Sequence, residues 1–235
     1  MRKFFVNQEL KDNIVFDEDY NHIVNVLRMK EGDNINLFNG DGYNYHYCID
    51  KINKKNIEAR LIEKNDNFKE NCVEVSLFQA FIKPDNMELI AQKLTELNVD
   101  NLYFFSSDYT NLKCKETIID KLKRVSAEAC KQCERSRVLN ISSVGKFDNM
   151  LSVLSNFDAI IFAYEKSNKN FKTAIENLKA KKVAVIVGPE GGFSEAEKES
   201  LLKLKNVLEV SISRNILKAE TASIMLASVL MYELN

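Results

Sequence analysis

The sequence has little glycine or proline and no tryptophan: 7 Gly, 2 Pro and no Trp occur in 235 residues. Such a composition excludes collagen-like repeats and Pro- or Gly-rich low-complexity chains. No apolar run approaches the roughly 20 residues that span a membrane, and residues 1–9 turn polar too early for the apolar core of a signal peptide. We therefore expect a globular, cytoplasmic protein with no membrane partner.

Positive charge is not in excess, because 33 Lys and Arg face 34 Asp and Glu. A formal net charge of −1 excludes the diffuse basic field of many nucleic-acid-binding chains, so such binding would require a local patch. With 45% hydrophobic residues the chain can bury a sizeable core. Its length allows one large domain or two small ones.

Residues that bind metals are also few, with two His and five Cys. Cys130 and Cys133 form a Cys-x-x-Cys, but no second Cys or His pair stands at the spacing of a zinc site. His22 and His46 have no Ser or Cys partner in a recognisable catalytic arrangement. We expect no metal site, and structural roles for both histidines.

The residue pattern changes near residue 70. Before it, short alternating segments predict strands, one helix is expected over 22–29 with Asp17 or Asp19 as its cap, and residues 1–68 together predict a small β-barrel. Residues 64–71 are polar and unpatterned, as in a linker. From 72 to 235 apolar strands alternate with helices, which is typical of a parallel sheet covered on both faces. The strands predicted there are 73–80, 102–105, 159–163, 183–187 and 208–212, and the helices are 87–97, 119–133, 171–178, 194–204 and 219–234.

Three of the seven Gly and one of the two Pro lie in the five residues Gly188–Gly192, between a predicted strand and a helix that Ser194 and Glu197 can open as a capping box. Ligands of open α/β sheets bind at the carboxyl ends of strands, so this loop is a candidate site. A phosphate cradle is disfavoured, because acids such as Glu190 crowd the loop and no Lys-Ser/Thr follows it. Carboxylates beside exposed amides suit a ligand with positive charge and hydrogen-bond donors, such as S-adenosylmethionine. The alternative is a turn that only reverses the chain, with the acids favouring the helix dipole.

A second polar segment, Ser213–Ala222, also lies between a predicted strand and a helix. Its apolar pair Ile216 and Leu217 could wall a flat ring while backbone groups read the edge of that ring. A charged loop that simply begins a helix is the alternative.

A third segment, Lys121–Arg137, has a basic stripe beside an apolar one, which is usually a solvated helix face. Gln132, Arg135 and Arg137 nevertheless gather where this helix ends. Such groups are suited to holding RNA phosphate or orienting a base.

Five segments taken in order resemble one known family over essentially the full chain. The chain resembles the ribosomal RNA small subunit methyltransferase E family, the 16S rRNA uridine N3-methyltransferases of the SPOUT superfamily. The segments that carry this resemblance are His22–Phe38, Lys93–Asn98, Glu128–Arg135, Gly188–Ser194 and Ile216–Ala222.

The resemblance implies an α/β fold in which a PUA-like β-barrel, residues 1–68, helps to hold RNA and precedes a trefoil-knotted SPOUT methyltransferase domain, residues 72–235. It implies a homodimer with the C-terminal helix at the interface, 16S rRNA or the small ribosomal subunit as partner, and RNA contacts from Arg28, Gln132, Arg135 and Arg137. The cofactor would be S-adenosylmethionine, surrounded by Tyr164, Val187, Gly188, Glu190, Gly191, Gly192, Ile212, Ser213, Ile216 and Leu217.

The chain departs from the family pattern at several positions. Asn98 and Ser213 stand where Gly is usual, Leu139 stands for Pro, Arg214-Asn215 stands for a Pro-Arg pair, and Lys218 stands for Arg. Lys218 keeps the charge but loses the planar fork of an arginine. These changes bear on individual RNA contacts rather than on the cofactor fold.

Methylation of uracil N3 requires an unpaired or flipped base, because N3 lies on the Watson–Crick edge. We hypothesise that Arg135 and Lys218 stabilise negative charge on the uracil carbonyls and that Glu220, or less well Glu190, accepts the N3 proton. Glu220 capping its helix is an equal alternative. An RNA-binding or ribosome-assembly factor with a degenerate cofactor pocket is the competing function.

Overall fold

The structure is a computed structural model that describes residues 3–66, 71–110, 116–164, 166–176 and 178–235. The chain divides into an N-terminal unit, residues 1–70 with 127–138, and a C-terminal unit, residues 71–126 with 139–235. The N-terminal unit therefore includes, besides the expected N-terminal residues, a second segment, residues 127–138, which is the end of one helix and the turn after it. Of the expected linker, residues 64–66 belong to a strand and residues 67–70 lie outside the described residues.

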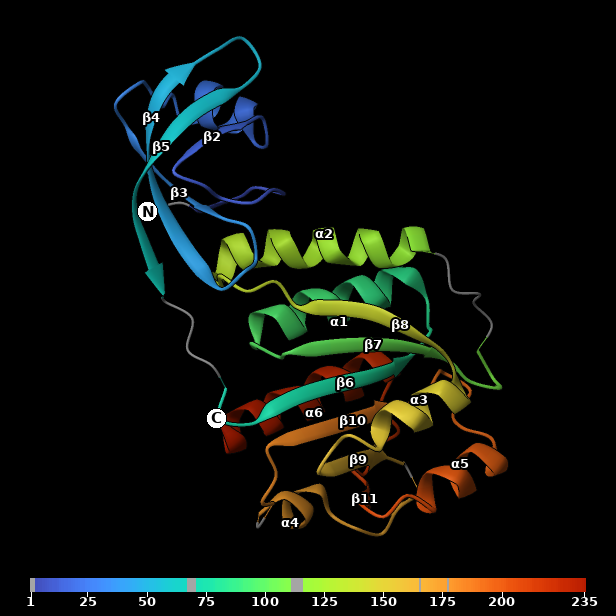
Figure 1. The fold of residues 1–235 in the computed structure, drawn as a ribbon. Coiled ribbons are helices and arrows are strands. Elements are labelled where there is room, and N and C mark those ends of the chain that lie inside the picture. The colour runs from blue at the N-terminus through green and yellow to red at the C-terminus, as the bar shows by residue number, and fades with distance from the viewer. Residues whose placement is uncertain (1–2, 67–70, 111–115, 165, 177) are drawn as a thin grey trace. The chain divides into compact units, whose positions relative to one another are not determined.

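The N-terminal unit is built on a curled five-stranded sheet with the order β1-β3-β4-β5-β2 (Figure 1). All neighbouring pairs are antiparallel except β1 with β3. Alternating side chains such as Tyr45, Tyr47 and Ile49 of β4 enter its core, as the period of two predicts. The strands are β1 (Lys3–Phe5), β2 (Asn13–Phe16), β3 (Asn34–Phe38), β4 (Tyr43–Ile52) and β5 (Ile57–Asp66).

The helix expected over residues 22–29 differs from its prediction. It is a π-helix, η1 (His22–Val26), closed by a hydrogen bond from the Leu27 amide to the His22 carbonyl. The expected cap at Asp17 or Asp19 is wrong, since Asn21 holds the N-cap position without a side-chain hydrogen bond. Asp19 instead adopts a left-handed backbone, with φ of 55°, and its carboxylate pairs with Lys131 at 2.7 Å.

The C-terminal unit contains a six-stranded sheet with the order β11-β9-β10-β6-β7-β8, and all its neighbouring strands are parallel. The chain lays down β6, β7 and β8 outward from the middle, and β10 then inserts between β6 and β9. The strands are β6 (Glu74–Ala80), β7 (Asn101–Ser106), β8 (Asn140–Lys146), β9 (Ala159–Ala163), β10 (Lys182–Val187) and β11 (Val207–Val210). The helices are α1 (Pro84–Glu96), α2 (Glu116–Cys133), α3 (Phe147–Leu154), α4 (Phe171–Ile175), α5 (Glu195–Leu202) and α6 (Ala219–Leu234).

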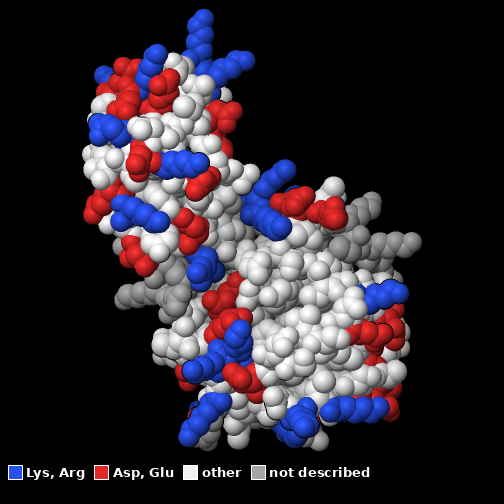
Figure 2. Space-filling model, viewed as in Figure 1, with Lys and Arg blue, Asp and Glu red and all other residues white. Residues whose placement is uncertain are grey.

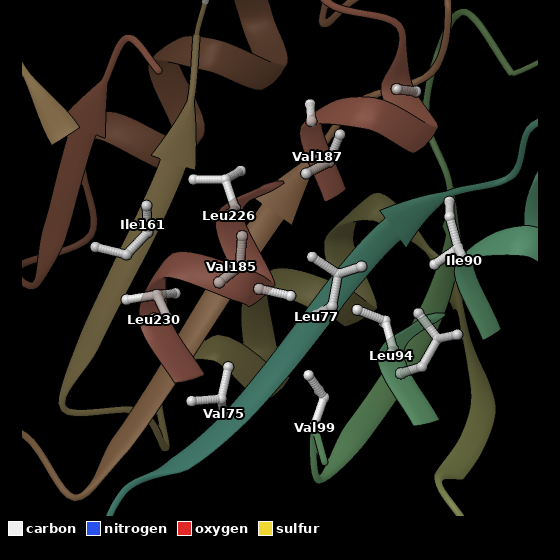
Figure 3. Close-up of a cluster of buried hydrophobic side chains, with 14 of the residues drawn as sticks. Val75, Leu77, Ile90, Leu94, Val99, Ile161, Val185, Val187, Leu226 and Leu230 are labelled. Carbon is white, nitrogen blue, oxygen red and sulfur yellow. The ribbon is translucent and has the colours of Figure 1, made fainter. Parts of the chain in front are cut away.

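Both faces of this sheet are buried, which confirms the reading of its apolar strands. Val183 and Val185 of β10 pack against residues of α1 and α6, such as Leu94 and Leu226 (Figure 3). The alternate residue Ile186 lies in a second cluster with residues of α3 and α5. Because each buried aliphatic side chain contributes about 1.5–3 kcal/mol, these two layers hold the strand ends rigidly where the loops begin.

The sequence pattern missed β8 and α3 and placed the start of α1 three residues late. Strand β8 reads Asn-Ile-Ser-Ser-Val-Gly-Lys, with one fully buried side chain, Ile141, so its pattern is weak. No described helix of the chain has the length and apolar character needed to cross a membrane.

Candidate functional site

A pocket of about 570 Å³ lies in the C-terminal unit, at the carboxyl ends of β9, β10 and β11. Its size is that of a small-molecule site. A parallel sheet brings these strand ends to one edge, where the loops that follow them can converge on a single ligand. Four segments supply the wall: Ala163 and Tyr164 at the end of β9, the residues after Val187, the segment from Val210 to α6, and the turn from β6 into α1 that contains Lys83.

The glycine loop, Gly188–Gly192, makes a tight turn along this wall. The Gly192 amide donates to the Pro189 carbonyl at 2.9 Å, and Gly192 has a φ of 74°, a region that favours glycine. Helix α5 then opens with the predicted capping box, in which Ser194 and Glu197 each accept from the other's backbone amide. The loop is thus fixed at both ends, by a buried strand and by a capped helix.

Phe193 supports the loop from beneath. Its ring stacks on Phe105 with an interplanar angle of 10°, and packs edge-on against Phe147 and Phe162. A Cβ added to Gly188 would lie only 2.8 Å from the Phe193 ring. Glycine is therefore required at 188 by space, not by backbone conformation.

The second loop runs from Ser211 to Lys218 and ends where α6 begins. The Ser213 hydroxyl accepts from the Asn215 amide at 3.0 Å, so the serine at this unusual position stabilises the turn. Ile216 is 85% exposed although it lines the pocket. An isoleucine held in this way offers an apolar surface that a ligand could cover.

Tyr164 continues from β9 along the pocket wall, and its ring is held on both sides. It stacks on Phe162 with an interplanar angle of 17°, and Lys198 of α5 lies 4.1 Å from the ring centroid. The hydrogen bond with Tyr164 raises the pKa of Lys198.

Charged side chains of both signs line the pocket. Glu190 and Glu220 are the acidic residues, as the sequence indicated, and Lys83 and Lys218 are the positively charged residues. Sequence reasoning missed Lys83 because it placed the helix start at residue 87. The same rule that singled out the glycine loop would have found it, since Lys83 follows the carboxyl end of β6.

A buried hydrogen-bond network links β6, the glycine loop and α6. The Gln79 side-chain amide of β6 donates to the Gly188 carbonyl at 3.2 Å and to the Ala80 carbonyl at 2.9 Å. Its carbonyl accepts from the Ser223 hydroxyl of α6. Gln79 and Ser223 are both fully buried, so this one amide links the glycine loop to the helix that follows the second loop.

The structure brings together all ten residues that the sequence indicated for the cofactor, and Lys218 and Glu220 lie in the same pocket wall. Further residues that the sequence did not indicate individually for the cofactor also line it: Lys83, Asn86, Ala163, Pro189, Phe193, Val210, Ser211, Asn215, Ala219 and Ala222. Groups of three or more residues able to hold a metal ion are absent from the part of the chain that the structure describes.

The expected RNA-binding residues Arg28, Gln132, Arg135 and Arg137 belong to the N-terminal unit. Arg28, Gln132 and Arg137 are exposed, whereas Arg135 is only 8% exposed and offers little surface to an RNA. Arg135 is not among the described residues that line the pocket, so its catalytic role stays a prediction. On the face shown in Figure 2, Lys and Arg of this unit are interspersed with Asp and Glu rather than gathered into a basic patch.

Comparison with known proteins shows which domain families the sequence of this chain matches. The RNA methyltransferase domain family matches residues 69–231, and the RNA methyltransferase PUA domain family matches residues 17–62. The chain is 28% identical to the Ribosomal RNA small subunit methyltransferase E of Bacillus subtilis, with 99% of this chain and 97% of that protein covered. It is 30% identical to the Helicobacter pylori protein of the same name, with 90% and 91% covered.

Solved structures agree in fold. A methyltransferase from Legionella pneumophila in complex with its cofactor SAM is 25% identical, with a TM-score of 0.85 over 98% of this chain and 96% of that one. The Ribosomal RNA small subunit methyltransferase E of Neisseria gonorrhoeae, bound to S-adenosylmethionine, has a TM-score of 0.79 at 21% identity, with 99% and 97% covered. Because one domain family matches well over half of its residues, this chain belongs to the RNA methyltransferase family.

Proposed function

We propose that this protein transfers a methyl group from S-adenosylmethionine to N3 of a uridine in the 16S RNA of the small ribosomal subunit. The observation that carries the proposal is the pocket at the carboxyl ends of β9, β10 and β11, which contains every residue expected around the cofactor. The names of the relatives from Bacillus subtilis and Helicobacter pylori support the substrate class. The cofactor bound by the Legionella pneumophila protein supports the methyl donor.

The residues of the pocket fit that cofactor in chemistry. Bound S-adenosylmethionine would supply an electrophilic methyl group beside a positive sulfonium. Glu190 would offset positive charge and accept from hydroxyls, while Ile216 and Leu217 would cover an adenine ring. The glycines of the loop, which carry no side chains, would let a ligand approach the backbone closely.

The chain's own residues would position the base and handle its proton. Lys218 would stabilise the negative charge that spreads to the uracil carbonyls as N3 loses its proton. Glu220 is the proton acceptor that we favour, with Glu190 as the other candidate. Glu220 lines the pocket from the first turn of α6, which supports a role toward the ligand.

The proposal includes a trefoil knot, a PUA-like barrel that helps to hold RNA, a homodimer joined through α6 and a location in the cytoplasm. The insertion of β10 between β6 and β9 supports a chain that crosses back on itself. The match of residues 17–62 to a PUA domain family supports the barrel.

Calorimetry with S-adenosylmethionine, followed by mapping of methylated uridines in rRNA from cells with and without this gene, tests the function. We expect a single binding site per chain and one N3-methyluridine that disappears when the gene is deleted. Absence of S-adenosylmethionine binding would contradict the proposal and favour an RNA-binding or ribosome-assembly factor with a degenerate pocket.

Replacing Ser223 with Ala should weaken S-adenosylmethionine binding although Ser223 does not line the pocket. The change leaves the buried Gln79 carbonyl without its donor, at a cost of about 1–3 kcal/mol, and loosens the link between Gly188 and α6. We expect the dissociation constant to rise several-fold by calorimetry.

Ser126→Ala is the matched control for this change. Ser126 is equally buried in the C-terminal unit, where it accepts from the Thr95 hydroxyl and the Leu139 amide. Ser126→Ala should lower the melting temperature about as much as Ser223→Ala and leave the dissociation constant of S-adenosylmethionine unchanged. Equal affinities in the two variants would show that the Gln79 network contributes only to stability.

A further inference from the structure

Tyr109 is an exposed aromatic residue next to the glycine loop, in the turn that follows β7. Half of its surface, 52%, is open to solvent. A Cβ added to Gly191 would lie 3.1 Å from the Tyr109 Cβ and 3.6 Å from its Cγ. The tyrosine therefore lies against the very position where a side chain of Gly191 would stand, and Gly191 itself lines the pocket.

The turn that carries Tyr109 is firmly held. The Thr110 hydroxyl accepts from the Ser107 amide at 2.9 Å, and the Thr110 amide donates to the Ser107 carbonyl at 3.0 Å. This double closure fixes the backbone on both sides of the tyrosine. The ring is thus presented from an ordered turn rather than from a loose loop.

A buried carboxylate joins this turn to the glycine loop. Glu197, only 4% exposed, accepts from the Asp108 amide at 2.9 Å with one oxygen and from the Ser194 amide at 3.0 Å with the other. The Ser194 hydroxyl also donates to the Asp108 carboxylate at 2.6 Å. Glu197 therefore caps α5 and also positions Tyr109 relative to Gly191.

We propose that Tyr109 is the stacking platform for the unpaired pyrimidine that receives the methyl group. The proposal rests on the proposed function and deepens it by naming a residue for the acceptor base. Tyr109 lies against Gly191, which lines the cofactor pocket, so a base stacked on its ring would lie beside that pocket. A base whose Watson–Crick edge must be reached has left its own stack, and aromatic rings are the usual replacement for those neighbours.

The chemistry of the position selects a nucleobase over other partners. Tyr109 is half-exposed and lies against a glycine that has no side chain, so part of its surface is open to a flat ligand. Stacking of a base on such a ring depends on the π-face and not on the tyrosine hydroxyl. Tyr109→Phe should thus keep the stacking of the acceptor base. Tyr109→Leu, which has similar apolar character but no ring, should lose this stacking.

Steady-state methylation of small ribosomal subunits isolated from cells that lack this gene tests the proposal, with calorimetry of S-adenosylmethionine on the same full-length proteins. Base–aromatic stacking corresponds to a factor of roughly 5 to 150, so we expect Tyr109→Leu to lower kcat/KM at least about 5-fold. The dissociation constant of S-adenosylmethionine and the melting temperature should stay close to the wild-type values, and Tyr109→Phe should be within about twofold of wild type throughout.

A Tyr109→Leu variant as active as wild type would overturn the proposal. Loss in Tyr109→Phe equal to that in Tyr109→Leu would also overturn it, because the hydroxyl and not the ring would then matter. A matching loss of S-adenosylmethionine affinity would assign Tyr109 to the cofactor instead. Wild-type protein that binds no S-adenosylmethionine or leaves the subunits unmethylated would remove the proposed function itself, an outcome distinct from these three.

Discussion

Gly188→Ala is expected to raise the dissociation constant of S-adenosylmethionine by about tenfold or more. The added methyl group would lie 2.8 Å from the Phe193 ring, well inside normal contact distance. That ring is packed against Phe105, Phe147 and Phe162, so any movement away from residue 188 disturbs these ring contacts. Overpacking of this kind costs about 1–3 kcal/mol, and because Gly188 lies in the pocket wall the displacement falls on the binding loop.

A second substitution separates this steric cause from general damage. Phe193→Leu lacks the Cε2 and Cζ atoms that a side chain at 188 would meet, so the double variant Gly188→Ala/Phe193→Leu should bind S-adenosylmethionine better than the two single effects predict. Calorimetry on all four proteins measures the coupling. Strictly additive losses would show that the Gly188–Phe193 contact does not determine the geometry of the loop.

The glycine loop was predictable because its signal is local. Three glycines between an apolar strand and a capping box require an unusual turn, whatever surrounds them, and the structure places that turn at a pocket. The same holds for the apolar strands β9 and β10, whose predicted and observed bounds differ by at most one residue. Local geometry and burial on both faces leave few alternatives for such segments.

Features that depend on distant partners were not predictable. Gln79 reads as one polar residue in an apolar strand, and its role becomes visible only when β10 and α6 bring Gly188 and Ser223 to it. Tyr109 gains its position from Glu197, 88 residues further along the chain. Neither contact leaves a periodic pattern in the sequence.

One departure from the family pattern has a simple physical reason. Asn98, which stands where glycine is usual, follows α1 with a φ of 61°, and asparagine tolerates this left-handed conformation better than most residues. Its side-chain amide also donates to the side-chain carbonyl of Asn71 at 2.9 Å. The fold therefore keeps the helix end that glycine would provide and adds a hydrogen bond.

Glu220→Gln should slow methyl transfer at least about 100-fold in single-turnover assays, because a positioned proton acceptor contributes roughly 10²- to 10⁴-fold. Glu220 lies in the first turn of α6 and in the pocket wall, two residues after Lys218. The amide keeps the size of the side chain and removes its ability to take the N3 proton. S-adenosylmethionine affinity should change by less than about threefold, so the loss would be in the chemical step.

Glu190→Gln is the matched comparison, since it is the same isosteric change in the same pocket. Glu190 is exposed on the glycine turn, whereas Glu220 is half-buried at the start of a helix and better shielded from competing water. We expect Glu190→Gln to weaken S-adenosylmethionine binding and to leave the single-turnover rate at saturation within about threefold of wild type. A slow single-turnover rate in Glu190→Gln with a near-normal rate in Glu220→Gln would identify Glu190 as the proton acceptor. Near-normal rates in both variants would mean that neither carboxylate accepts it, and that the base is activated by the stabilised charge on its carbonyls, with water as the proton acceptor.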